Sequence, residues 1–199
     1  MASQSWSQLV ASMPIQGQLY NTFTTAKSLL TSTASEASQA ACILPSGFFR
    51  RNGRLKITAE FGLSNIVTTP GTLTLQVMVG GIIAFTTGAL FMTTTANTLL
   101  PVRCEINLTC QKEGNGTTAQ LMGQAFLWGQ NVAMATGLAN GAANTGWAAG
   151  PATSPALGTG FDSTIANTLD FQAAFSISNA GNGIQLAQYM VESWGNTAD

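Results

Sequence analysis

Few side chains in this sequence could perform chemistry, and histidine is absent from the chain. Without histidine there is no Ser-His-Asp triad, and the commonest general base and zinc ligand are missing. A glycosidase needs only two carboxylates, which leaves the acidic residues as catalytic candidates: Glu60, Glu105, Asp162, Asp170 and Glu192. Since Glu60, Glu105 and Asp170 fall on the polar positions of expected strands, the pattern favours scattered, solvated acids over a catalytic pair.

The segment "GTGFDST", residues 158–164, superficially resembles a glycine-rich phosphate loop. It lacks the lysine and the following helix that such loops require. We interpret it as a turn that enters a strand, in which Asp162 bonds the backbone N–H two residues on. The chain has no CxxC pair and no recognisable motif for a cofactor or a metal. The sequence therefore predicts a protein that is not an enzyme and that carries no cofactor.

The elements that would position any site follow a period of two. In "RLKITAEFGLS" (54–64), "VRCEINLTCQK" (102–112) and "TLDFQAAFSIS" (168–178), every second residue is apolar and most residues between are polar. Such alternation is typical of antiparallel strands with one core face and one solvated face. About eight short strands, with turns roughly every 8–15 residues, favour a β-sandwich or jelly roll over an open sheet.

Eighteen uncharged residues, Leu75–Met92, approach the length of a membrane-spanning helix. Gly80-Gly81 interrupts them, however, and a Gly-Gly pair supplies the positive φ angles of a two-residue hairpin. We therefore expect two strands and no membrane association. Further hairpin turns are expected at Glu113–Thr118 and Asn179–Gly183, and a change of phase near Gln188 predicts a β-bulge.

The composition is poor in charge. Only 8% of residues are charged, and the net charge is −1. The chain therefore has no basic footprint for nucleic acid and no polybasic membrane patch. A surface of small polar residues tolerates permanent contact, which indicates an assembly protein. The cysteines, Cys42, Cys104 and Cys110, are expected to be buried free thiols, and the N-terminus shows no secretion signal.

Two regions are expected: an extended N-terminal arm over residues 1–42 and a sandwich domain over residues 43–199. Apolar side chains of the arm have no core of their own and must be buried against the body or a neighbour. The "RRNGRLK" segment (50–56) is either a solvated turn or a docking patch for an acidic surface. The stretch 137–160 is expected to be a long loop. Candidate partner contacts from these three regions are Trp6, Tyr20, Phe23, Arg50, Arg51 and Trp147.

Whole segments of residues 43–194 resemble a family of tailed-bacteriophage virion proteins. The resemblance lies in a "LPSGFF" entry, a "SNIVTTPGTLTLQV" strand pair, a "LTC" hairpin that returns through "LMGQ", and a "FDST" turn followed by "LDF". It implies an all-β, antiparallel β-sandwich of jelly-roll type that is built into a phage particle.

With that resemblance, the sequence predicts a capsid cement or decoration protein that bridges neighbouring capsid subunits. The expected partners are copies of the same chain, as a trimer, and the major capsid protein. The expected location is the capsid surface of a virion assembled in the host cytoplasm. One alternative is a tail, baseplate or fibre component that binds a host receptor. Another is a jelly-roll carbohydrate-active enzyme, which exposed aromatic clusters and close carboxylates would favour.

Overall fold

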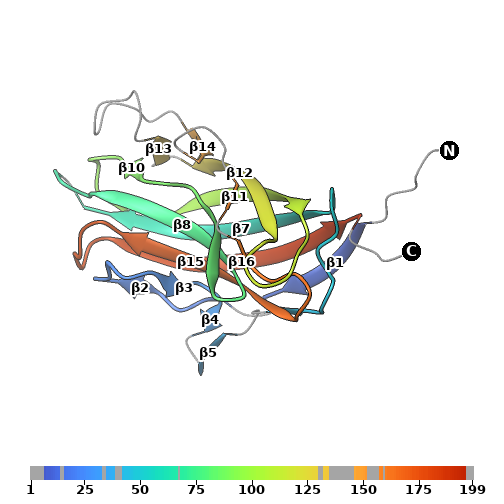
Figure 1. The fold of residues 1–199 in the computed structure, drawn as a ribbon. Helices are drawn as coiled ribbons and strands as arrows, with labels where there is room; N and C mark the ends of the chain where they lie inside the picture. Colours follow the sequence, from blue (N-terminus) through green and yellow to red (C-terminus); the bar gives the residue numbers. More distant parts are fainter. Residues whose placement is uncertain are drawn as a thin grey trace.

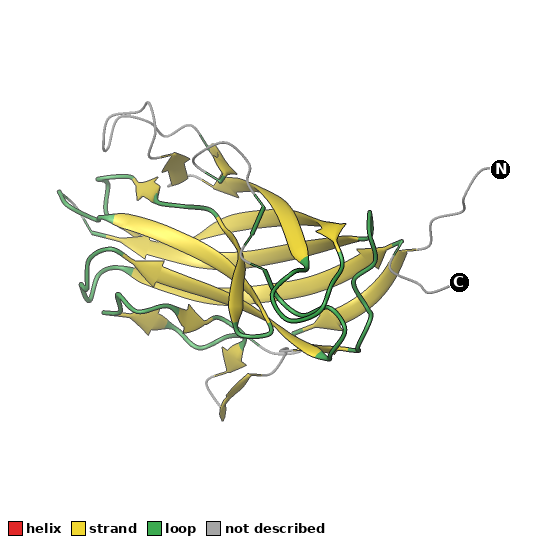
Figure 2. Ribbon diagram, in the orientation of Figure 1, coloured by secondary structure: helices red, strands yellow, loops and turns green. Residues whose placement is uncertain are grey.

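The strands of this protein form two antiparallel sheets packed face to face (Figures 1 and 2). The structure is a computed structural model, and none of the residues it describes is helical. The described residues are 7–13, 16–32, 35–38, 42–66, 68–129, 132–134, 146–151, 157–158 and 160–195. The predicted all-β fold class and antiparallel sandwich are confirmed, and the arrangement is consistent with the jelly-roll type.

The first sheet contains the longest strands. Its order is β1 (Ser7–Ser12), β16 (Gly183–Trp194), β7 (Arg54–Asn65), β11 (Asn97–Lys112), β12 (Gln120–Gly129) and β14 (Trp147–Gly150), and β2 (Tyr20–Asn21) also pairs with β16. Each pairing is antiparallel, as the alternation predicts.

The second sheet lies against the first. Its order is β13 (Val132–Met134), β10 (Leu90–Met92), β8 (Thr72–Val79), β15 (Asn167–Phe175) and β3 (Lys27–Ser28). Two short strands join its rim, β6 (Cys42–Leu44) on β15 and β9 (Ile82–Thr86) on β8. A separate small hairpin pairs β4 (Thr31–Ser32) with β5 (Ser35–Ser38) and projects below the body in Figure 1.

The core lies between the sheets and is built by the predicted alternation. Along β7 and β8, every second side chain is buried, from Leu55 to Leu63 and from Leu73 to Val79. Cys104 and Cys110 of β11 belong to the same buried face and are free thiols, as expected. Burial raises the pKa of the Cys110 thiol to about 11, with a smaller contribution from the charge of Glu113. The core therefore keeps this thiol in its neutral form.

The uncharged segment 75–92 forms strands, as predicted. Gly80 and Gly81, with φ angles of +59° and +80°, make the two-residue turn between β8 and β9. Among the described residues, no helix has the length and hydropathy needed to cross a membrane. The predicted bulge is also present, because the register of β16 against β7 shifts between Leu186 and Gln188. The shift returns Tyr189 and Val191 to the buried face that Leu186 occupies.

The described part of residues 1–42 belongs to the sandwich rather than to a separate arm. Strands β1 and β2 pair with β16, and β3 pairs with β15. Leu29 and Leu30 are fully buried, and the Leu29 N–H donates to the carbonyl of Phe171 at 2.8 Å. The predicted boundary at residue 42 therefore does not divide the described chain, because the sandwich needs these apolar side chains to close one rim of its core.

The expected long loop at 137–160 also contains a strand. Its residues 147–150 form β14, which extends the first sheet beyond β12. Ala148 is fully buried beneath the sheet, whereas Trp147 points away from the core. Small residues suffice here because a four-residue edge strand needs only one or two inward side chains to dock.

Candidate functional site

The outer side of the first sheet, called the charged face below, carries side chains in cross-strand rows. One row runs Glu60 (β7), Arg103 (β11), Trp128 (β12) and Trp147 (β14), because these residues are register partners in turn. A neighbouring row contains Thr58 (β7), Glu105 (β11) and Phe126 (β12), which are also register partners in turn. The sheet thus brings aromatic and ionic side chains from four strands onto one surface.

Ion pairs link the centre of the charged face. Arg103 donates from Nη2 to Oε1 of Glu105 at 2.7 Å, and its Nη1 lies 3.4 Å from Oε1 of Glu60. The Nζ of Lys56 lies 3.2 Å from Oε2 of Glu105. Burial alone would raise the pKa of Glu105, but the hydrogen bonds and charges of Arg103 and Lys56 outweigh it and hold that pKa below its ordinary value. Glu105 is therefore an ionised acceptor and is poorly suited to act as a general acid.

Three aromatic side chains, called the aromatic patch, lie beside these charges. Phe126 and Trp128 stack with ring centroids 6.2 Å apart and an interplanar angle of 28°. Trp128 lies opposite Trp147 across the β12–β14 pair. Their side chains remain 41%, 44% and 57% exposed, respectively. Large aromatic residues exposed together on a sheet are typical of a contact surface.

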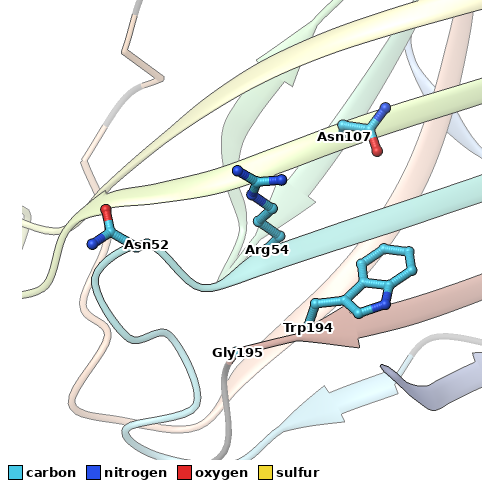
Figure 3. A pocket seen from close by; sticks show the side chains of 5 residues that line it. All are labelled: Asn52, Arg54, Asn107, Trp194 and Gly195. Carbon is cyan, nitrogen blue, oxygen red and sulfur yellow. The ribbon is translucent and has the colours of Figure 1, made fainter. Parts of the chain in front are cut away.

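A polar hollow of about 530 Å³ lies at the other end of the charged face (Figure 3). Arg54 and Trp194 are register partners on β7 and β16 and project to the same side of the sheet. Asn107 of β11 approaches from the next strand, and Asn52 and Gly195 complete the lining. This hollow offers a guanidinium group, two amides and one indole ring to a ligand.

The outer side of the second sheet, called the neutral face, has a different character. The outward positions of β8 and β15 are Thr72, Thr74, Gln76, Met78, Thr168, Asp170, Gln172 and Ala174. Both strands lie wholly within the described chain, and Asp170 is the one charged side chain among these eight. It accepts hydrogen bonds from Ser28 at 2.6 Å and from Gln172 at 2.9 Å. Ile43 and Ile83, which are 73% and 39% exposed, add apolar area beside these strands.

The structure separates the sequence-predicted contact residues. Trp6 lies outside the described residues. Tyr20 is partly buried, and its hydroxyl is hydrogen-bonded to the hydroxyl of Thr31. Phe23 is 7% exposed and packs edge-on against Phe175 at 5.1 Å, so it serves the core of its own chain and is unavailable to a partner. An extended arm was the reason for proposing these contacts, and the described part of it is packed into the body.

The basic side chains of the "RRNGRLK" segment (50–56) lie in two separate parts of the structure. Arg50 forms an ion pair of 3.7 Å with Glu113, and the backbone N–H of Arg51 donates to the same carboxylate at 2.7 Å. Arg54 and Lys56 instead lie on the charged face. Glu113 forms an ion pair with Arg50, and Glu105 forms one with Lys56. The segment therefore does not present one continuous basic patch to an acidic surface.

Of the predicted contacts, Trp147 lies in the aromatic patch, and the sequence analysis missed Phe126 as its companion. A signal was available in "LMGQAFLWG". Leu121, Ala125 and Leu127 are buried at alternate positions, so the intervening Phe126 and Trp128 had to face outward. When both the odd and the even positions of a strand are apolar, one set must lie on the surface. Such a pattern near the edge of a sheet indicates a surface aromatic cluster.

Among the described residues, no group of three or more histidine, cysteine or acidic side chains gathers that could hold a metal ion. Asp162 makes the predicted turn, since its carboxylate accepts the Thr164 N–H at 2.8 Å. It also accepts the Gly116 N–H at 2.9 Å and thereby links two turns. The hydroxyl of Thr164 and these N–H groups lower the pKa of Asp162.

Comparisons with known proteins give weak similarities. No family model matches the chain, and no curated protein matches it. A protein of unknown function from Shewanella oneidensis MR-1 is similar with 11% identity and a TM-score of 0.37, over 97% of this chain and 81% of that one. The CBM2 module of the evolved Dit of Lactobacillus casei BL23 phage J-1 is similar with 10% identity and a TM-score of 0.34, over 99% of this chain and 100% of that one. At such TM-scores neither neighbour bears on the function of this chain.

Proposed function

We propose that this chain is a structural protein of a tailed-bacteriophage virion and acts as a capsid cement or decoration protein. The resemblance of residues 43–194 to phage virion proteins supports this proposal, and the two-sheet sandwich agrees with the fold that the resemblance implies. The protein works without catalysis. It binds the major capsid protein and copies of itself, as a trimer on the capsid surface.

The neutral face is the observation that carries the structural role. Cores of protein interfaces are depleted in charged side chains, because each desolvated charge must be compensated. The outward positions of β8 and β15 carry one charge in eight, and that charge is already hydrogen-bonded within the chain. Ile43 and Ile83 add apolar area beside it. This face can therefore dock on a capsid surface at little electrostatic cost.

The attachment is tested by placing a charge on each face in turn. Particles that lack the protein are incubated with wild type, with Thr74→Lys on the neutral face, and with Thr109→Lys on the charged face. Circular dichroism confirms that each variant is folded. We expect Thr74→Lys to bind particles much more weakly than Thr109→Lys, which should bind like wild type. Equal binding by both variants would show that the neutral face is not the docking surface.

A second candidate is a tail, baseplate or fibre component that binds a host receptor. The exposed aromatic patch favours it, since cement function alone does not require such a patch on the opposite face. Quantitative mass spectrometry of purified virions distinguishes the two candidates. A copy number comparable to that of the major capsid protein supports the cement role, whereas a few copies per particle supports the tail.

A further inference from the structure

We infer that the charged face binds a neutral polysaccharide, with Phe126, Trp128 and Trp147 as its stacking platform. This inference goes beyond the structural role proposed above, and it holds for a protein of the head or of the tail. Its support comes from the aromatic patch, the polar side chains beside it, the balance of charge on this face and the hollow at its far end.

The aromatic patch has the form that sugar rings require. A pyranose ring presents several C–H bonds on one side, and these pack against the negative face of an aromatic ring. Phe126 and Trp128 stack, so one face of each ring is turned toward the other, and their side chains still keep 41% and 44% of their surface exposed. Trp147 continues the surface on the adjacent strand. The patch can therefore receive more than one sugar ring along its length.

Hydrogen-bonding side chains border the patch on the central strands. Glu105 is the register partner of Phe126, Arg103 is that of Trp128, and Asn107 pairs with Gln124 one row further on. A sugar hydroxyl both donates and accepts hydrogen bonds. It can therefore satisfy a carboxylate, a guanidinium group and an amide alike. A surface of mixed donors and acceptors beside aromatic rings suits a polyhydroxylated ligand.

The placement of charge argues against a protein as the occupant of this face. Protein interfaces have an apolar core and a polar rim. Here the ion pairs of Lys56, Glu60, Arg103 and Glu105 lie on the two central strands, and the aromatic patch lies toward the β14 edge. A flat protein partner would have to desolvate these ions in the middle of the contact, which is costly. A hydrated glycan would leave most of them in water.

The balance of charge argues against an anionic polymer. Arg54, Lys56 and Arg103 along this face are matched in number by Glu60, Glu105 and Glu192, and one further cation, Lys112, lies at the end of β11 opposite Gln120. Lys56 and Arg103 are already paired with carboxylates. Binding to anionic polymers depends on unneutralised cationic charge. The face therefore favours a neutral chain over an acidic one.

The charged face is long enough for an extended polymer. Trp194 lies at its opposite corner beside Arg54, and Trp194 is three strands and six residues from Trp128, which corresponds to about 25 Å across an ideal sheet. The hollow there supplies a third indole, that of Trp194, and further hydrogen-bonding groups. A linear polysaccharide could contact both corners at once, so several sugars share the binding energy.

Affinity electrophoresis of the purified full-length chain tests the inference. Gels contain dextran, mannan, laminarin or soluble xylan as neutral polymers, and heparin as an acidic comparison. We expect retardation by at least one neutral polymer. Trp128→Ala and Trp147→Ala should each weaken that retardation about tenfold or more, as expected for the loss of a central aromatic contact.

Ile43→Ala on the neutral face is the matched control and should migrate like wild type in the same gels. Retardation by heparin alone, absence of retardation by all four neutral polymers, or full retention by both tryptophan variants would overturn the inference. The particle-binding assay with Thr74→Lys is independent of these gels, so failure of glycan binding and failure of the structural role are separately visible.

Discussion

Arg103 donates a 2.7 Å hydrogen bond to Glu105, although the two residues lie on the same strand and are only two positions apart. Because side chains two apart on a strand share a face, the ion pair lies along β11 and leaves Lys56 of β7 free to reach the same carboxylate from the side. Glu105 thus joins two strands electrostatically at the centre of the charged face.

The Glu105→Gln variant should be slightly less stable than wild type, by up to about 1 kcal/mol, since the pairs are partly solvated. The lowered pKa of Glu105 means that its stabilisation is present above the ordinary value of 4.5 and is lost as the pH falls through the lower folded-state value. Thermal unfolding at about pH 7 and about pH 3 should therefore show a smaller difference between wild type and variant at the lower pH. A difference that persists unchanged in acid would contradict this account.

Alkaline pH should destabilise the protein. Burial raises the pKa of Cys104, Cys110 and Tyr189, to about 11 for Cys110. In the unfolded chain the thiols lose their protons near 9.0, so the folded state binds more protons above that pH. The stabilisation is complete below 9.0 and is lost as the pH rises through about 11. Thermal melts of wild type and Cys110→Ala across this range should show a shallower decline for the variant, and parallel declines would refute the assignment.

Deleting residues 1–32 should abolish cooperative unfolding rather than leave the sandwich intact. The deletion removes β1 and the side chains of Phe23, Leu29 and Leu30 from the core. A point variant gives a finer test: Leu30→Ala should cost about 2–5 kcal/mol of stability. Leu19→Ala, at a residue 43% exposed, should cost within about 0.5 kcal/mol. Denaturant melts measure both, and similar small losses would place Leu30 outside the core.

Gly160→Ala should be destabilising because an added Cβ would lie 1.8 Å from the carbonyl oxygen of Thr117. That oxygen belongs to the backbone, so the 113–118 turn must move away from the 160–164 turn, at about 1–3 kcal/mol or more. Gly81→Asn is the control. A Cβ there meets nothing within 4 Å, and asparagine tolerates a positive φ. Equal melting temperatures for the two variants would count against the close approach.

The protein should not hydrolyse the polysaccharides used in the binding assay. A general acid needs a raised pKa, and those of Asp162 and Glu105 are both lowered. Reducing-sugar release after prolonged incubation measures hydrolysis, with Asp162→Ala in parallel. Release that is lost in this variant would reveal a catalytic carboxylate and would replace the structural interpretation with an enzymatic one.

Much of the fold could be predicted because buried and exposed positions alternate along a β-strand, and the sequence alternates between apolar and polar residues accordingly. Gly80-Gly81 and the phase change near Gln188 located a turn and a bulge, since both depend on neighbouring residues alone. The placement of residues 1–42 could not be predicted in this way. Strands of two residues, such as β2 and β3, carry no period, and only their long-range pairing with β16 and β15 defines them.

The candidate site was predicted less completely for a related reason. The sequence predicts Trp147 as a contact because it lies in an expected long loop, but its pairing with Trp128 depends on β14 joining β12. The ion pairs of Arg103 depend likewise on register between β7 and β11. Residue type identifies candidates, whereas contacts between strands distant in sequence decide which of them meet.

The position of β16 has a consequence for synthesis on the ribosome. This last strand lies between β1, the first strand, and β7, so it fills a gap in the middle of the first sheet. Until Gly183–Trp194 leave the exit tunnel, β1 has no partner among the described strands, and the backbone edge of β7 stays open to other chains. The first sheet therefore cannot close until Gly183–Trp194 have been synthesised, and a chain that stops before them has an unpaired strand edge that is prone to aggregate.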